Sequence, residues 1–96
     1  MKTNYTPKPM DTSAITVPAE LEELSEVLAR NTHEVWSRQR LSDGWTWGET
    51  LDAVAKTHPD LVPYDELTEG EKQYDRNTSM ETIKVILSMG YQLVKA

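Results

Sequence analysis

The sequence predicts a mainly α-helical domain with two long helices, irregular loops rich in tryptophan and proline, and short edge strands that pair the two ends of the chain. Apolar residues recur at the spacing of an amphipathic helix in two stretches, one in the first half and one in the last third. The stretch between them holds Trp45 and Trp47 together with prolines, and it keeps no steady period. Short runs of strand-forming residues at 15–17 and 91–94 predict the terminal pairing.

Size and composition limit what the chain can be. Its 96 residues suit a single domain over 1–96, and an apolar fraction of 38% without phenylalanine predicts a thin core. The net charge of −6 argues against binding to a nucleic-acid polymer or an anionic membrane. No apolar run approaches the roughly 18 residues of a membrane span, and the N-terminus lacks the apolar segment of a signal peptide. We therefore expect a cytoplasmic protein.

The first long helix is expected to begin at Pro18, after an extended N-terminal arm over residues 1–14 that contains Pro7 and Pro9. Proline suits the first helical turn, and the glutamates that follow suit the positive end of the helix dipole. A left-handed Gly44 is expected at its end. The predicted buried face consists of Leu21, Leu24, Leu28 and Val35.

The connection between the long helices is expected to contain a short helix over residues 49–57, stopped by Pro59. A loop pinned by Pro59 and Pro63 should follow. The expected inward-facing side chains of this loop are Leu61, Val62, Tyr64 and Leu67.

The second long helix is expected to open with a capping box formed by Thr68 and Glu71. Thr78 and Glu81 repeat the same spacing, so the helix either continues through this point or breaks and restarts. Gly90 should end it, and the strand-like residues after it should pair with residues 15–17.

A concentration of large, polar-tipped side chains marks the end of the first long helix. His33, Trp36 and Arg40 stand at positions i, i+3 and i+7, which places them along one stripe of a helix. A flat ring, an imidazole and a guanidinium could grip a planar anionic molecule. Trp45 and Trp47 fall on one side of an extended segment and could add a stacking platform. The alternative is that these aromatic residues are core.

Several motifs together resemble the ryanodine-receptor repeat (RyR) domain family, over nearly the whole chain. They are Tyr5-x-Pro7, Asn31-x-His33-x-x-Trp36, Gly44-Trp45-Thr46-Trp47-Gly48, His58-Pro59-x-Leu61-Val62-Pro63-Tyr64, Glu69-x-Glu71-Lys72-x-Tyr74-Asp75-Arg76 and Gly90-Tyr91. The resemblance implies a mostly helical RyR-repeat-like fold, of the single-copy type found in bacterial and phage chains. One departure lies after Gly48, where Glu49 and its neighbours replace a basic residue that family members often carry.

The resemblance further implies a non-catalytic binding module for a nucleotide-derived small molecule, such as an ADP-ribose-like or cyclic nucleotide messenger. The stripe of His33, Trp36 and Arg40 is the part expected to face the ligand. Arg76, in the Tyr74-Asp75-Arg76 motif, is expected to form a structural ion pair or a network on the helix surface, with a phosphate contact as the alternative. The full expected ligand-binding set is His33, Trp36, Arg40, Trp45, Trp47, Tyr64 and Arg76.

Two kinds of output fit such a module: sequestering the messenger, as a phage anti-defence sponge would, or sensing it for a separate effector. The family likeness leaves no length for a second domain, which favours binding itself as the output. A homodimer is expected, because the channel repeats occur in pairs and the core is thin. The alternatives are a protein-interaction or dimerisation module without a small ligand and a small hydrolase of a nucleotide messenger.

Catalysis, metals and cofactors are not expected. The chain has no cysteine, which excludes disulfides and thiolate metal sites, and no serine stands in a nucleophile elbow. His33 and His58 lie far apart in the sequence, and neither has acidic neighbours at metal-ligand spacing.

Overall fold

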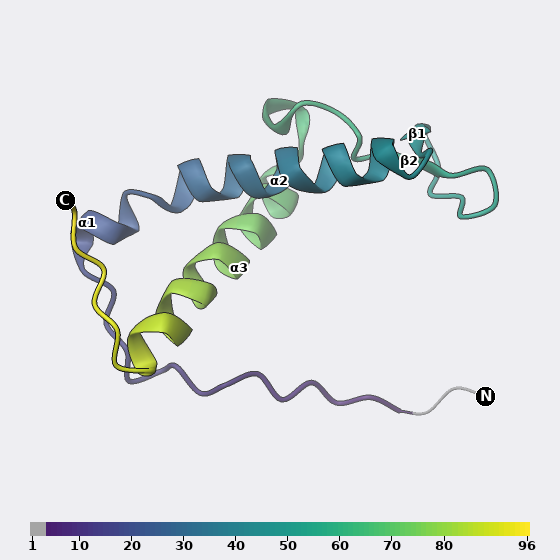
Figure 1. Cartoon of the computed structure of the whole chain (residues 1–96). Helices are drawn as coiled ribbons and strands as arrows, with labels where there is room; N and C mark the ends of the chain where they lie inside the picture. The colour runs from purple at the N-terminus through teal and green to yellow at the C-terminus, as the bar shows by residue number, and fades with distance from the viewer. Residues whose placement is uncertain (1–3) are drawn as a thin grey trace.

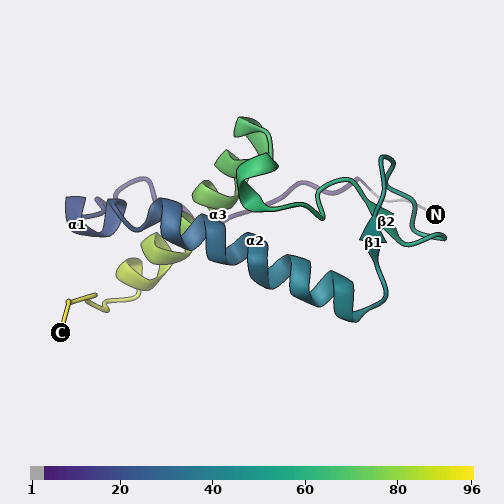
Figure 2. The ribbon, with the colours of Figure 1, turned by 90° about the horizontal axis from the view of Figure 1, so that it is seen from above.

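The computed structural model describes residues 4–96, and two long helices that cross each other dominate it (Figure 1). The loop that joins them carries a small sheet and a short 3₁₀ helix, and it lies beyond the crossing (Figures 1 and 2). The prediction of a mainly α-helical chain is confirmed. The elements are α1 (Ala19–Glu22), α2 (Ser25–Ser42), β1 (Thr46–Trp47), β2 (Thr57–His58), η1 (Tyr64–Glu66) and α3 (Glu69–Ser88).

The first predicted helix is interrupted near its start. Leu24 donates its N–H to the carbonyl of Leu21, three residues back, so a turn separates α1 from α2. Glu22 and Glu26 stand at i, i+4 across this turn, and like charges at that spacing disfavour a continuous helix. The far end follows the prediction: Gly44 has φ 90° after the last turn of α2.

The second long helix is continuous. Thr68 and Glu71 form the predicted capping box, with the Glu71 N–H donating to the Thr68 hydroxyl and the Glu71 carboxylate accepting from the Thr68 N–H. The helix runs through Asn77 without a break, which decides between the two sequence-based alternatives. Gly90, with φ 92°, follows its end as predicted.

The short helix predicted over residues 49–57 is wrong, because this segment forms turns. The Asp52 carboxylate accepts the N–H groups of Val54 and Ala55, which holds the backbone in a local turn. Leu51 and Val54 are 59% and 96% exposed, so no buried apolar face stabilises a helix here.

The predicted pairing of the chain ends is also wrong, since neither 15–17 nor 91–94 forms a strand among the described residues. The Ile15 N–H donates to the Thr12 carbonyl in a local turn instead. The strands present are β1 and β2, which pair in parallel with Thr46 opposite Thr57 and Trp47 opposite His58. In this pairing the N–H groups of Thr46 and Gly48 donate to the carbonyls of Lys56 and His58, so these backbone groups of the loop are hydrogen-bonded to one another.

The core is small and lies where α2 passes the loop and α3. Ala29 is fully buried, and its small side chain lets Tyr64 and Leu67 pack against α2, with Val62 beside them. Val17 and Ile83 are buried as well, and the Thr12 hydroxyl donates to Glu81 of α3, which fastens the chain before α1 to the second long helix.

In the part of the chain that the structure describes, neither long helix combines the length and the apolar character that a membrane crossing requires. That observation concerns residues 4–96 alone.

Candidate functional site

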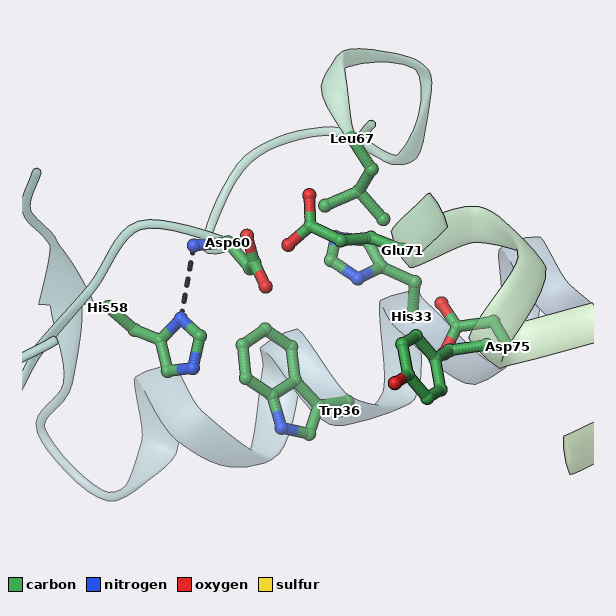
Figure 3. A pocket seen from close by; sticks show the side chains of 8 residues that line it. His33, Trp36, His58, Asp60, Leu67, Glu71 and Asp75 are labelled. Carbon is green, nitrogen blue, oxygen red and sulfur yellow. Dashed lines mark hydrogen bonds between the residues drawn. The ribbon is translucent and has the colours of Figure 1, made fainter. Parts of the chain in front are cut away.

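A pocket of about 300 Å³ opens between α2, the segment after β2, and the first half of α3 (Figure 3). Residues from three parts of the chain, far apart in the sequence, line it together. Its lining consists of His33, Trp36, His58, Asp60, Leu67, Glu71, Tyr74 and Asp75.

Trp36 forms one wall of this pocket and is braced by both histidines. The His33 ring stacks beside the indole, with centroids 5.6 Å apart and planes 27° apart. The His58 ring meets it edge-on at 4.8 Å. Trp36 is half-buried, so these neighbours fix the orientation of the ring while part of it stays accessible.

His33 holds the loop against α2. It is 4% exposed, and its Nε2 lies 2.7 Å from the carbonyl oxygen of Val62, so Nε2 carries the proton and donates it to that oxygen. The Ser37 hydroxyl lies 3.4 Å from the same nitrogen. His33 therefore supports the pocket wall from behind.

Arg40 lies beside Trp36, although it is not one of the residues that line the pocket. Its guanidinium carbon lies 4.6 Å from the centroid of the Trp45 ring and 5.7 Å from that of Trp36. Burial and this nearby positive charge lower the pKa of His58 from its usual value of 6.5, so the imidazole of His58 is neutral at pH 7.

Three carboxyl groups face the pocket, and the sequence-based set contained none of them. Figure 3 shows the carboxyls of Asp60 and Glu71 turned toward one another above Trp36, with Asp75 farther along α3. Burial and a hydrogen bond with Glu71 raise the pKa of Asp60 to about 6. The same bond lowers the pKa of Glu71, and burial raises that of Asp75. The acidic side of the pocket thus pairs a protonatable carboxyl with an ionised one.

The remaining predicted residues lie around the pocket and do not line it. Trp45 is half-buried against Arg40 and lies 6.3 Å from His58, whereas Trp47 is 54% exposed. Tyr64 is 2% exposed, and its buried hydroxyl has no hydrogen-bond partner within residues 4–96. Burial, helped by the Glu26 carboxylate, raises the pKa of that hydroxyl.

Arg76 connects the two long helices. Its Nε donates to Glu26 of α2 at 2.7 Å, and one terminal nitrogen donates to Glu69 of α3 at 3.1 Å. This arrangement matches the structural ion pair expected from the sequence.

The acidic lining could have been found from two local signals. Glu71, Tyr74 and Asp75 stand at i, i+3 and i+4, which places them on one face at the start of the second helix. Asp60 follows two residues after His58, and its N–H donates to the His58 Nδ1 at 3.0 Å. What sequence spacing could not supply is the approach of this loop to α3.

The carboxyls and imidazoles do not converge as metal ligands: residues 4–96 contain no group of three or more such side chains placed to hold a metal ion. The pocket offers an aromatic face, a protonatable carboxyl pair and a neutral imidazole instead.

Comparison with known protein families gives a match to the RyR domain over residues 5–95. The matched region includes both long helices, the loop between them and every side chain that lines the pocket. The resemblance drawn from the sequence motifs is thereby confirmed at the level of the family. The chain belongs to the RyR domain family.

Proposed function

We propose that this chain is a non-catalytic binding module for a nucleotide-derived small molecule, whose base stacks on Trp36. The observation that carries the proposal is the accessible indole in the wall of a pocket that also holds hydrogen-bonding groups. A cavity of about 300 Å³ is at the small end of the range for ligand sites. It suits a nucleoside, and the rest of a larger messenger would extend outside it.

The charges around Trp36 suggest how such a ligand lies. Glu71, Asp75 and the Asp60 carboxyl favour hydroxyl and amino donors, as a carboxylate that binds ribose hydroxyls does. They disfavour a phosphate in the same space. Arg40 lies 5.7 Å from the Trp36 centroid and supplies a positive charge outside the pocket. We therefore orient the sugar or amino group toward the carboxyls and the phosphate toward Arg40.

Calorimetric titration of the whole chain with adenosine, ADP-ribose and cyclic nucleotides tests this proposal. Binding of at least one of them, with heat-released ligand recovered intact, supports a non-catalytic module. If none of the three classes binds at millimolar concentration, the nucleotide proposal is wrong.

Binding of this kind can act by sequestration. A protein in excess of its messenger, with a dissociation constant below the working concentration, lowers the free messenger by mass action. The test is to incubate messenger with the protein, measure the loss of effector activation, and then denature the protein by heat. Full recovery of activating messenger supports sequestration, and no loss before heating contradicts it. A sensor that passes the signal to a separate effector is the other form of the same binding function.

One observation favours a hydrolase as the second candidate. Asp60 and Glu71 form a carboxyl pair whose pKa values are pushed apart, which is how acid and base roles are divided in many active sites. Asp60 would serve as the acid and Glu71 as the base. Mass analysis of the recovered ligand separates the candidates: cleaved ligand, together with loss of cleavage in Asp60→Asn, would establish the hydrolase.

A further inference from the structure

The chain exposes more surface than a monomer of its size should. Its accessible area is 7708 Å², whereas a compact monomer of 11.0 kDa exposes about 5,600 Å². Its radius of gyration is 16.4 Å, against about 12 Å for a compact domain of this length. The extended, exposed residues 4–11 account for part of the excess. The two long helices also diverge on either side of their crossing (Figures 1 and 2).

Part of this surface is an apolar groove between α1, the turn that leads into α2, and the C-terminal residues. Its apolar lining consists of Leu21, Leu24, Leu93 and Val94. The groove encloses about 480 Å³, and Val94 is 81% exposed. Val27 stands one turn after Leu24 on α2 and is 64% exposed, so an apolar ridge lies next to the groove. Adjacent exposed apolar groups of this kind mark an interaction surface.

We propose that a second copy of this chain covers the groove through a two-fold interface. A two-fold interface requires a surface that complements itself, and a ridge beside a groove meets that requirement. The charges at the rim of the groove also complement one another, since α1 and the turn after it contribute Glu20 and Glu23, and the C-terminal segment contributes Lys95. In a two-fold pair, the acidic rim of each copy faces Lys95 of its partner.

The area available fits this assembly. A stable interface buries roughly 600–1,000 Å² from each partner. The excess surface of this chain is about 2,100 Å² over the monomer expectation. That excess is about twice the area or more that each partner of a stable dimer buries. The inference is independent of the nucleotide proposal, because the groove and the Trp36 pocket share no lining residue.

Sedimentation velocity on the whole chain, with matched lysine substitutions, tests the interface. Val27→Lys places a charge on the ridge, Leu93→Lys places one in the groove, and Val54→Lys is the control. Val54 is 96% exposed and lies in the β1–β2 loop, outside the groove. Its substitution therefore makes the same charge change away from the proposed interface. Lysine is a good helix former, and Leu93 lies outside any helix or strand, so neither interface variant should unfold the chain.

The wild type and Val54→Lys are expected to sediment as dimers at about 100 µM. Both Val27→Lys and Leu93→Lys should raise the dimer dissociation constant at least tenfold, with circular dichroism spectra unchanged. A wild type that is monomeric at that concentration would overturn the proposal. So would interface variants that dimerise as tightly as Val54→Lys.

Discussion

Trp36 shows how a single residue can be both supported and accessible. His33 stacks on it and His58 meets its edge, yet the ring remains half-buried at the pocket wall. His33 itself is committed to the Val62 carbonyl, so the imidazole supplies support, and the indole is the group free to stack on a ligand. In the proposed site, the orientation of the indole therefore depends on side chains that need not touch the ligand.

Trp36→Ala is expected to weaken nucleotide binding about ten- to a hundredfold, because a stacked base contributes roughly 1–3 kcal/mol. Isothermal titration calorimetry measures the change. Trp47→Ala is the matched control, since Trp47 is 54% exposed and does not line the pocket. Equal weakening by both substitutions would contradict the assignment, as would a Trp36→Ala chain that binds normally. Trp36→Leu keeps much of the packing if the alanine variant fails to fold.

Asp60→Asn is expected to stabilise the chain at about pH 8 and to have little effect at about pH 4. The folded chain raises the pKa of Asp60 from 3.8 to about 6, so it holds more protons than the unfolded chain between these values. The contribution of the Asp60 carboxyl to the free energy of unfolding is therefore fully present below pH 3.8 and is lost as the pH rises through 6. Asparagine removes that loss and can donate to Glu71.

The expected gain for Asp60→Asn is on the order of 1 kcal/mol after allowance for solvent screening, or about 4–8 °C in Tm for a domain of this size. Thermal unfolding across the pH range measures it. Glu34→Gln removes a carboxylate from an exposed position on α2, outside the pocket, and is the control. A pH-independent effect of Asp60→Asn would show that the carboxyl pair is not formed.

At the scale of elements, the position of the pocket depends on the loop between the long helices. The parallel pairing of β1 with β2 carries His58 back to Trp36, and η1 then turns the chain into α3. Gly48 permits this pairing, because a Cβ on it would lie 2.5 Å from the Thr57 Cβ. A short sheet of two residues per strand therefore depends on one glycine.

Gly48→Ala is expected to destabilise the chain by about 1–3 kcal/mol, as overpacking does. Chemical denaturation measures the loss. Thr57→Gly removes the atoms that clash, so the penalty of Gly48→Ala should be smaller in a Thr57→Gly background. Additive effects in that double-mutant cycle would mean that the close contact is relieved elsewhere.

Arg76→Met is expected to lower the free energy of unfolding, and with it the Tm, without changing the affinity for nucleotide. The substitution removes ion pairs to Glu26 and Glu69, at 2.7 and 3.1 Å, that connect α2 to α3. Arg38→Met removes the same charge from an exposed position on α2 and serves as the control. If Arg76→Met weakens the affinity for nucleotide and Arg38→Met does not, the result would support a contact between Arg76 and a phosphate of the ligand.

At the scale of the whole molecule, the small core and the large exposed surface have the same cause, which is that few apolar side chains are buried. Thirteen large apolar side chains are exposed and five apolar residues are buried among those described, so the isolated chain has little apolar burial to stabilise it. Pairing of two copies, as proposed above, would add to this stability by mass action.

The Tm of the wild type is therefore expected to rise by about 2–4 °C for each tenfold increase in protein concentration. The reason is that folding and pairing are coupled by mass action. Differential scanning calorimetry over two decades of concentration measures the shift. Val27→Lys should abolish it, and Val54→Lys should preserve it. A wild-type Tm that does not depend on concentration would contradict coupling between dimerisation and stability.

The sequence by itself determined the features that rest on short-range physics. The capping box at Thr68 and the glycines that end the two long helices, Gly44 and Gly90, are local features, and the structure keeps them. The predicted apolar face of the first helix is kept only in part, because Leu24 is 41% exposed. The family motifs are local in the same sense, and they led to the RyR domain assignment. Trp36 was also identified from helical spacing, and it does line a pocket.

Tertiary structure alone decided which strands pair and which side chains surround Trp36. Residues 15–17 have strand character, but Val17 is drawn into the core and Ile15 closes a turn. Asp60 and Glu71 form a pair only because the loop folds onto α3, and burial then changes the proton affinity of both carboxyls. Periodicity records which face of an element is apolar, whereas strand partners and shared protons depend on contacts between distant segments.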